Sequence, residues 1–311
     1  MHSRHRRVFA AALLATAIAY SPSAAQDAPH ASNLVFRSSI DVVSVTAVVR
    51  DRKGRTVPSL SREQFEVIDA GQPRTILDVT ADAASPTSIA LLVDGSGSMR
   101  IGAALESSRA IADGVLASLD ANRDAAALLS FDSRLLTLQD FTSDFDRIRG
   151  SLFNVQAWGT TSLYDAIAGA AGIVSERTQN RRAIIVLTDG ADNASEYTPE
   201  EVAHIASSID VPVYVFSLAS SGTPWPGDTI TPHRRSTLAQ LAHATGGDFI
   251  MADTPKLVAA GIQRVVDELR HQYLISFEAS SFQGLRRIEI RTRQSGLKVR
   301  SRGWYQGSNG E

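Results

Sequence analysis

Residues 88–98 read Ser-Ile-Ala-Leu-Leu-Val-Asp-Gly-Ser-Gly-Ser, an apolar run that ends in a carboxylate, two glycines and two hydroxyls. An apolar run this short, bounded by glycine, is typical of a strand buried on both faces of a sheet. A second apolar run, residues 183–187, ends in the same manner at Thr188-Asp189-Gly190. In an open α/β sheet the loops at the carboxyl ends of such strands converge, and ligands bind there. The two runs therefore predict a polar site at one edge of a parallel sheet.

The chain around these runs alternates between strand and helix patterns from residue 87 to residue 271, which is typical of a largely parallel sheet. We therefore predict a doubly wound, mostly parallel α/β domain over residues 87–271. The predicted strands are 87–93, 125–131, 135–138 (a short edge strand), 182–188, 211–218 and 248–251. The predicted helices are 101–119, 162–177, 199–208, 235–245 and 255–271.

The two flanks of this domain have β patterns instead. Residues 34–80 alternate apolar and polar side chains, and so do the segments 272–277, 286–293 and 297–305. A lone hairpin is marginally stable, so pairing of 34–80 with 272–305 supplies the missing strands. The predicted result is a small accessory β domain, with 306–311 as a disordered tail. The arginines and lysine of its C-terminal strands, up to Arg302, are expected on a hydrated outer face, with an anionic contact surface as the alternative.

Residues 1–25 have the pattern of a secretory signal peptide: three arginines, an apolar stretch from Val8 to Tyr20 and small residues up to Ala25. We expect export to the periplasm or beyond the cell after cleavage near Ala25, by the Sec or the twin-arginine route. Residues 26–33 are a polar linker, and the apolar stretch is too short and alanine-rich to predict a membrane span. The mature chain is therefore predicted to have no transmembrane segment.

Composition excludes several kinds of site. The chain has no cysteine, so disulfides and thiolate metal sites are absent. Its formal net charge of −2 becomes more negative once the leader is removed, which argues against a nucleic-acid partner. A P-loop and a dinucleotide fingerprint are also absent, because no Gly-Lys-Ser/Thr follows Gly95 and Arg100 stands where a fingerprint needs glycine or alanine.

Five side chains in three loops form the candidate metal site. The spacing Asp-x-Ser-x-Ser lets a carboxylate and two hydroxyls wrap one ion, and the loops at 159–162 and 188–190 add a third hydroxyl and a second carboxylate. Such an oxygen-only set suits Mg²⁺, with Mn²⁺ or Ca²⁺ as alternatives. Because hydroxyls are neutral, the ion keeps charge for an incoming carboxylate, so a protein or peptide partner is expected. The predicted ligands are Asp94, Ser96, Ser98, Thr161 and Asp189.

These three loops resemble those of the von Willebrand factor type A domain over about residues 87–271. The resemblance covers Asp-Gly-Ser-Gly-Ser (94–98), the Gly-Thr-Thr loop (159–161) before Ser162, and Thr-Asp-Gly (188–190). The flanks, including Gln64-Phe65-Glu66-Val67, are similar to an exported bacterial subgroup. The resemblance implies a metal-ion-dependent adhesion site, in which some carboxylates act through water. It also favours Thr161 over the adjacent Thr160 as the ligand.

Two other functions remain open at this stage. A strand-end Asp94 beside Mg²⁺ could be the nucleophile of a hydrolase or phosphotransferase, although Ser96 stands where such enzymes have a second Asp. The ion could also be purely structural. We predict a binding module and no catalytic residue. Two neighbouring features have ordinary alternatives as well: Asp192 and Asn193 fit a site rim or a solvated loop, and the Pro-rich loop 223–228 fits recognition or local packing.

Overall fold

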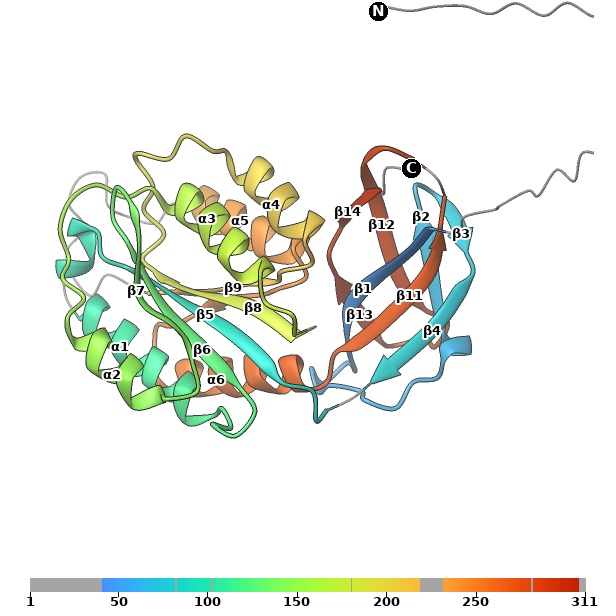
Figure 1. The fold of residues 1–311 in the computed structure, drawn as a ribbon, viewed down its shortest axis with the longest axis horizontal. Coiled ribbons are helices and arrows are strands. Elements are labelled where there is room, and N and C mark those ends of the chain that lie inside the picture. Colours follow the sequence, from blue (N-terminus) through green and yellow to red (C-terminus); the bar gives the residue numbers. More distant parts are fainter. Residues whose placement is uncertain are drawn as a thin grey trace, which may run out of the picture. The chain divides into compact units, whose positions relative to one another are not determined.

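The computed structural model describes residues 41–81, 83–101, 103–179, 181–218, 232–280 and 282–307, with 232–234 described by backbone only (Figure 1). The predicted leader, linker and loop 223–228 lie outside these ranges. All elements below belong to one compact unit, Ser39–Glu311. No helix in the described ranges is long and apolar enough to span a membrane.

The larger sheet has six strands in the order β10-β9-β8-β5-β6-β7, all parallel except β7, which pairs antiparallel with β6. Every residue of β5 is buried, as expected for a central strand covered on both faces. The strands are β5 (Thr87–Asp94), β6 (Ala125–Phe131), β7 (Leu135–Thr142), β8 (Arg181–Thr188), β9 (Val213–Ser217) and β10 (Phe249–Met251).

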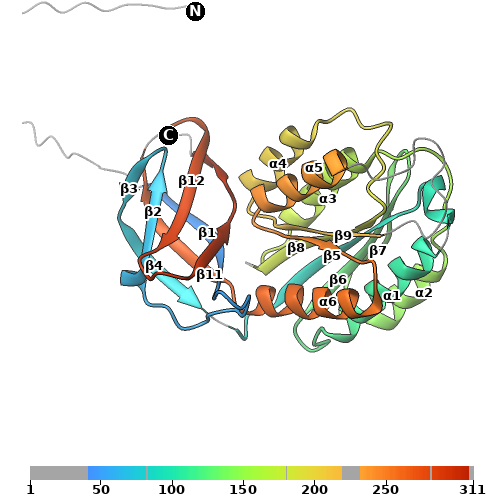
Figure 2. The same cartoon turned by 180° about the vertical axis from the view of Figure 1, so that it is seen from behind.

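Six helices cover this sheet, three on each face (Figures 1 and 2). The first face carries α1 (Ala104–Ala117), α2 (Phe145–Phe153) and α6 (Pro255–Arg270), and the second α3 (Leu163–Ser175), α4 (Pro199–Ser208) and α5 (Pro232–Ala244). Separate apolar cores fill the two layers, one with Ile111 of α1 and Val265 of α6, the other with Ile167 of α3 and Val202 of α4. The predicted doubly wound α/β class is confirmed.

The flanking segments form two four-stranded antiparallel sheets, ordered β13-β1-β11-β4 and β14-β12-β2-β3. Their apolar faces enclose a common core that includes Val45, Phe65, Tyr273 and Ile290. This sandwich confirms the predicted accessory β domain built from both flanks. Its strands are β1 (Asp41–Arg50), β2 (Phe65–Asp69), β3 (Gln72–Arg74), β4 (Ile76–Ala81), β11 (Tyr273–Ala279), β12 (Gly284–Thr292), β13 (Lys298–Ser301) and β14 (Trp304–Gly307), with a 3-10 turn, η1 (Arg62–Gln64), before β2.

Three elements differ from the sequence prediction. Helix α2 was not predicted, although Asp144 caps it by accepting from Arg147 N and its Ile148 and Leu152 are buried. Strand β7 continues to Thr142 instead of ending at 138. The predicted strand 297–305 is two strands, because the chain leaves the β1 sheet at β13 and joins the β12 sheet at β14.

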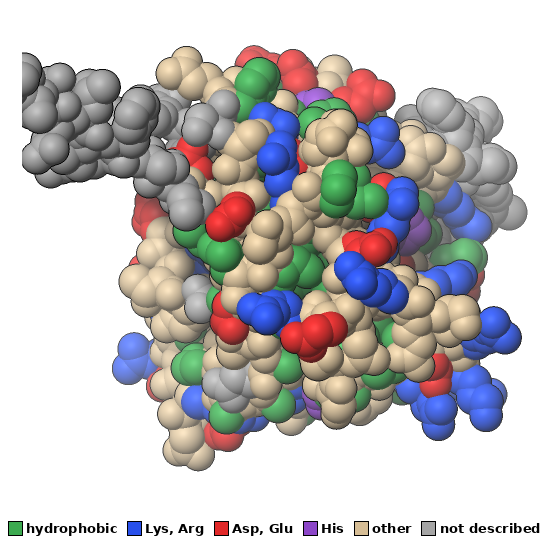
Figure 3. Space-filling model, turned by 90° about the vertical axis from the view of Figure 1, so that its right-hand side faces the viewer, with side chains coloured by type: hydrophobic (Ala, Val, Ile, Leu, Met, Phe, Trp, Pro, Cys, Tyr) green, Lys and Arg blue, Asp and Glu red, His purple; other side chains and the backbone are tan. Residues whose placement is uncertain are grey.

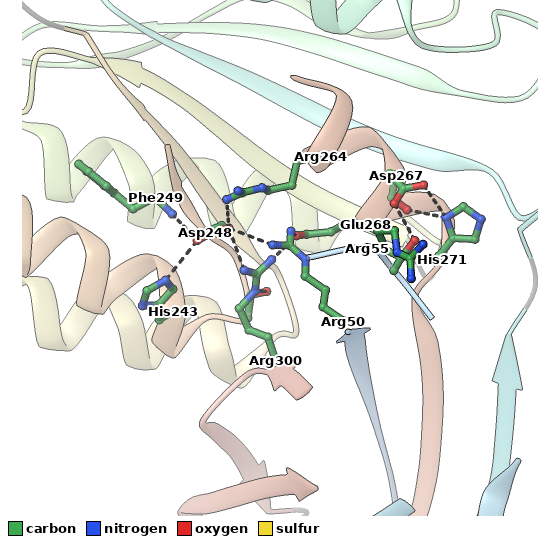
Figure 4. A network of polar contacts seen from close by, with 12 residues as sticks. Arg50, Arg55, His243, Asp248, Phe249, Arg264, Asp267, Glu268, His271 and Arg300 are labelled. Carbon is green, nitrogen blue, oxygen red and sulfur yellow. Dashed lines mark hydrogen bonds and ion pairs between the residues drawn. The ribbon is translucent and has the colours of Figure 1, made fainter. Parts of the chain in front are cut away.

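The prediction of a hydrated face was wrong for Arg300, although Arg287 and Arg291 are exposed as expected. Arg300 contacts the α/β domain, where its Nη1 lies 3.0 Å from Asp248 Oδ2 and its Nη2 pairs with buried Glu268 of α6 (Figure 4). Arg264 also donates to Asp248 Oδ2, at 3.1 Å. Burial alone would raise the pKa of Asp248, but the hydrogen bond with His243 and the charges of Arg300 and Arg264 outweigh it and hold the pKa below its usual range.

Arg302 is a second error of the same kind, because it is only 5% exposed. Its Nη1 donates to Ser207 O at the end of α4 (2.7 Å), and its Nη2 donates to Ser44 O of β1 (2.7 Å). Asp210, 3.4 Å from Arg302 Nε, accepts from the backbone N–H and the hydroxyl of Thr46. The sandwich and the α/β domain are thus joined by buried, directional polar contacts.

The outward side of the sandwich has a different character. Figure 3 shows Lys and Arg interspersed with Asp and Glu over that side, without a large area of one sign. Opposite charges mixed in this way are typical of a solvated surface. The sandwich therefore presents no strongly charged surface there.

Candidate metal centre

The first loop of the site begins at Asp94, the last residue of β5, and passes through Ser96 into a 3-10 turn, η2 (Gly97–Arg100). Asp94 is fully buried and its Oδ1 accepts from Ser96 N at 2.8 Å. Gly95 donates to Phe131 O at 2.7 Å, and a Cβ on it would lie within 3.0 Å of the Ser130 hydroxyl. Close packing against β6 therefore favours glycine at this position.

The second loop, residues 154–162, is hydrogen-bonded to the first. Gly97 N donates to Gly159 O at 3.1 Å, and Trp158 N donates to Gly95 O at 2.8 Å. Gly159 has φ +80°, a conformation that favours glycine. These two backbone bonds hold the loops beside each other without using any side chain of the candidate site.

Thr161 and Thr160 are placed differently by this loop. Thr161 is 2% exposed and lines a pocket together with Ser98, whereas Thr160 is exposed to solvent. Asn193 fixes Thr161 from the third loop, because its Oδ1 accepts from Thr161 N at 2.9 Å and its own N–H donates to Thr161 O at 3.0 Å. Of the two threonines, Thr161 is the one that lines the pocket.

The third loop follows β8 and is bonded to Asp94. The Thr188 hydroxyl donates to Asp94 Oδ2 at 2.6 Å and accepts from Gly190 N at 2.9 Å. Asp189 is nearly fully buried, and its Oδ1 accepts from Ala191 N at 3.0 Å. Gly190, at φ +80°, makes the tight turn that allows both bonds.

The three loops surround a pocket of about 330 Å³. The hydroxyl oxygens of Ser96 and Ser98 lie 3.0 Å apart within the first loop. Neighbouring ligands of an octahedral Mg²⁺ with bonds near 2.1 Å are separated by about 3 Å, so this spacing suits two ligands of one ion. The pocket is lined by Gly97, Ser98, Ile101, Gly159, Thr161, Ala191 and Asn193.

The electrostatics of the site also suit a cation. The pKa of Asp94 is raised to about 7. Burial is the main cause, and the nearby negative charge of Asp189 is the second. No Lys, Arg or His nitrogen in the described ranges lies within 4.0 Å of either carboxylate, although ion pairs of that length occur elsewhere in the structure. Buried carboxylates are normally paired with a cation or bound to a metal. The donor set, two carboxylates and three hydroxyls, therefore fits a hard divalent ion.

Comparison with protein-family models gives one match, to the von Willebrand factor type A domain, over residues 89–191. That range contains all three loops of the site. Over residues 89–191, the α/β domain matches the von Willebrand factor type A family. A comparison with curated protein sequences finds no match.

Several solved structures have a similar fold, all at low sequence identity to this chain. The conserved hypothetical protein BatB of Bacteroides thetaiotaomicron is 18% identical, with 58% of this chain and 97% of that chain covered and a TM-score of 0.47. An aerotolerance-related membrane protein of Bacteroides fragilis is 19% identical, with 59% and 98% covered and a TM-score of 0.49. A von Willebrand factor type A protein of Catenulispora acidiphila is 12% identical, with 89% and 77% covered and a TM-score of 0.49.

The residues that hold the three loops of the site in position could not be assigned from the sequence. These residues act by hydrogen bonding, and they are Thr188, Asn193 and Asp192. The Oδ1 atom of Asp192 accepts from Leu163 N at the start of α3, at 2.9 Å, and from the Ser195 hydroxyl. Of the two alternatives for Asp192 and Asn193, a site rim or a solvated loop, the rim holds for Asn193, which lines the pocket. Asp192 supports the start of α3 instead. The only signal in the sequence was their closeness to Asp189, since a long-range bond such as that from Thr161 N to Asn193 leaves no local pattern.

Proposed function

We propose that this type A domain binds a divalent cation, Mg²⁺ by preference, and through it a carboxylate of a protein or peptide partner. Asp94, Ser96, Ser98, Thr161 and Asp189 would hold the ion, directly or through water. The observation that carries the proposal is the pair of buried carboxylates, Asp94 and Asp189, without a cationic partner, beside a pocket that exposes the hydroxyl of Ser98.

A bound ion would supply an electrophilic position for an anionic ligand. The chain's own contribution is to fix the ligands and leave one side accessible. Asp94 is held on both oxygens, by Ser96 N and the Thr188 hydroxyl, while Ser98 and Thr161 face the pocket. Mg²⁺ dehydrates reluctantly and keeps several waters, so an incoming carboxylate would replace water on the pocket side. An accessible side of this kind supports ligand binding over a purely structural ion.

A nucleophilic role for Asp94 has less support. An attacking carboxylate oxygen must reach the substrate, but Asp94 is fully buried and both of its oxygens accept hydrogen bonds from the protein. We therefore propose a binding module and not an enzyme.

The direct test is a pull-down from the native envelope fraction with the full chain, in Mg²⁺, in EDTA, and with Asp94→Asn. The proposal expects a partner that is retained only by the wild-type protein in Mg²⁺. A partner retained equally under all three conditions would contradict it. Turnover of phosphate esters that depends on Asp94 would instead favour the hydrolase.

We also propose that residues 1–25 direct export, with cleavage near Ala25. N-terminal sequencing of the protein recovered from the cell envelope or the medium tests this. A mature chain beginning at Gln26 is expected, and recovery of the intact N-terminus from the cytoplasm would contradict it.

A further inference from the structure

Arg100 and Trp158 form a stacked pair beside the candidate metal site. The guanidinium carbon of Arg100 lies 4.5 Å from the centre of the Trp158 ring, within the range of a cation–π interaction. Trp158 is 61% exposed, and Arg100 is exposed as well. The pair therefore presents an aromatic ring and a cation side by side to solvent.

The pair is fixed to the loops that hold the metal ligands. Arg100 ends the η2 turn that contains Ser98, and its neighbour Ile101 lines the pocket. Trp158 precedes Gly159, which lines the same pocket, and its N–H donates to Gly95 O at 2.8 Å. The stack therefore lies at the rim of the pocket, and its position depends on the same backbone bonds.

Arg100 has no anionic partner in the described ranges, within either hydrogen-bond distance or 4.0 Å. Arg149, by contrast, is paired with both Asp113 and Asp146. Stacking on an aromatic ring uses the face of a guanidinium and leaves its N–H groups free in the plane. Arg100 is thus a partly immobilised cation whose donors can form a bidentate contact with a carboxylate at little entropic cost.

We infer that the Arg100–Trp158 pair is a second anion subsite, and that the partner is an acidic peptide segment with two neighbouring carboxylates. One carboxylate binds the metal, and the second binds the guanidinium of Arg100. This inference rests on the proposed function. A divalent ion would neutralise Asp94 and Asp189, and in the described ranges the guanidinium of Arg100 has no anion within 4.0 Å, although Asp132 also lies beside Gly159 at the rim.

Capped synthetic peptides of the form acetyl-Gly-Asp-Gly-Gly-Gly-amide test the inference, compared with versions that carry a second Asp one, two or three positions later. Binding to the full chain in saturating Mg²⁺ is measured by calorimetry and by Trp fluorescence. At least one two-carboxylate peptide should bind about 10-fold more tightly than the single-carboxylate peptide, as expected for one charge-assisted contact.

The variants separate the subsite from general charge effects. Arg100→Gln should remove the preference, so that the peptides with one and with two carboxylates bind with about equal affinity in Mg²⁺. Trp158→Ala should reduce the preference, because it frees the guanidinium. Arg134→Gln removes an exposed charge from the β6–β7 turn and should have no effect. Thermal melting checks that each variant is folded.

The outcomes distinguish the two proposals. Mg²⁺-dependent binding without a preference for two carboxylates, or a preference that survives Arg100→Gln, overturns the subsite alone. Absence of Mg²⁺-dependent binding of every peptide overturns the proposed function and the subsite with it.

Discussion

The Thr188 hydroxyl donates a 2.6 Å hydrogen bond to Asp94 Oδ2, and this bond joins the ends of the neighbouring strands β8 and β5. Thr188 accepts in turn from Gly190 N, so the third loop and the first metal-site carboxylate are fixed together. A residue that binds no ion can thereby determine how the carboxylate of Asp94 is oriented.

Replacement of Thr188 by Val should weaken Mg²⁺ binding by about 10-fold, in the range seen when a residue supporting a metal ligand is lost. The valine keeps the shape but leaves Asp94 Oδ2 without its donor. Calorimetric titration with Mg²⁺ measures the effect. Thr137→Val, on the exposed part of β7, is the matched control and should bind normally. Equal affinities of the two variants would contradict the positioning role.

Asp94→Asn should abolish the stabilisation that Mg²⁺ gives to the wild-type protein. Ligand at 100 times its Kd contributes about 2.7 kcal/mol to the free energy of unfolding. In EDTA the variant should be at least as stable as the wild type, because one of two buried, unpaired negative charges is gone. Urea unfolding with and without Mg²⁺ measures both effects. Asp253→Asn, on an exposed side chain, should retain the full response to metal.

The two adjacent threonines provide a sharp comparison. Thr161→Ala should weaken Mg²⁺ binding by about 10-fold or more, since it removes a hydroxyl from the pocket. Thr160→Ala, one position earlier and exposed, should leave binding unchanged. Calorimetry on both proteins is the measurement. A larger effect at Thr160 would mean that Thr160, and not Thr161, is the metal ligand.

Much of this arrangement could be predicted from local patterns. The buried runs before Asp94 and Asp189 predicted strands, and the glycines after them predicted turns that bring oxygens to one edge. Contacts between distant segments could not be predicted in that way. Arg300 and Arg302 have the alternation of an exposed strand face, yet their partners Asp248 and Ser207 belong to the other domain. Alternation shows which residues share a face, but not what covers that face.

Arg302→Ala should lower the free energy of unfolding by about 3 kcal/mol or more, because it removes the buried guanidinium that donates to the Ser207 and Ser44 carbonyls and that lies beside the carboxylate of Asp210. Arg287→Ala, on the exposed face of β12, should change stability by less than about 0.5 kcal/mol. Urea unfolding in EDTA compares them. Equal losses of unfolding free energy in the two variants would show that the Arg302 contacts do not stabilise the protein.

Asp248 should make part of the protein's stability dependent on pH. Its pKa is held below the usual range, so its contribution is present above the unfolded-state pKa of about 3.9 and is lost as pH falls through the folded value. The stability difference between the wild type and Asp248→Asn should therefore be largest near neutral pH and shrink below about pH 4. Urea titrations across this range test it.

The sandwich takes strands from both sides of the type A domain, and this has a consequence for the order of folding. Among the described strands, β1 pairs with β11 and β13, so its first residues meet partners such as Ala279 more than 200 positions later. As the chain emerges from its N-terminus, β1 and β4 must wait until the whole α/β domain has been made. Contacts of such long range are slow to form, so the type A domain can fold first and bring the two late-pairing segments together.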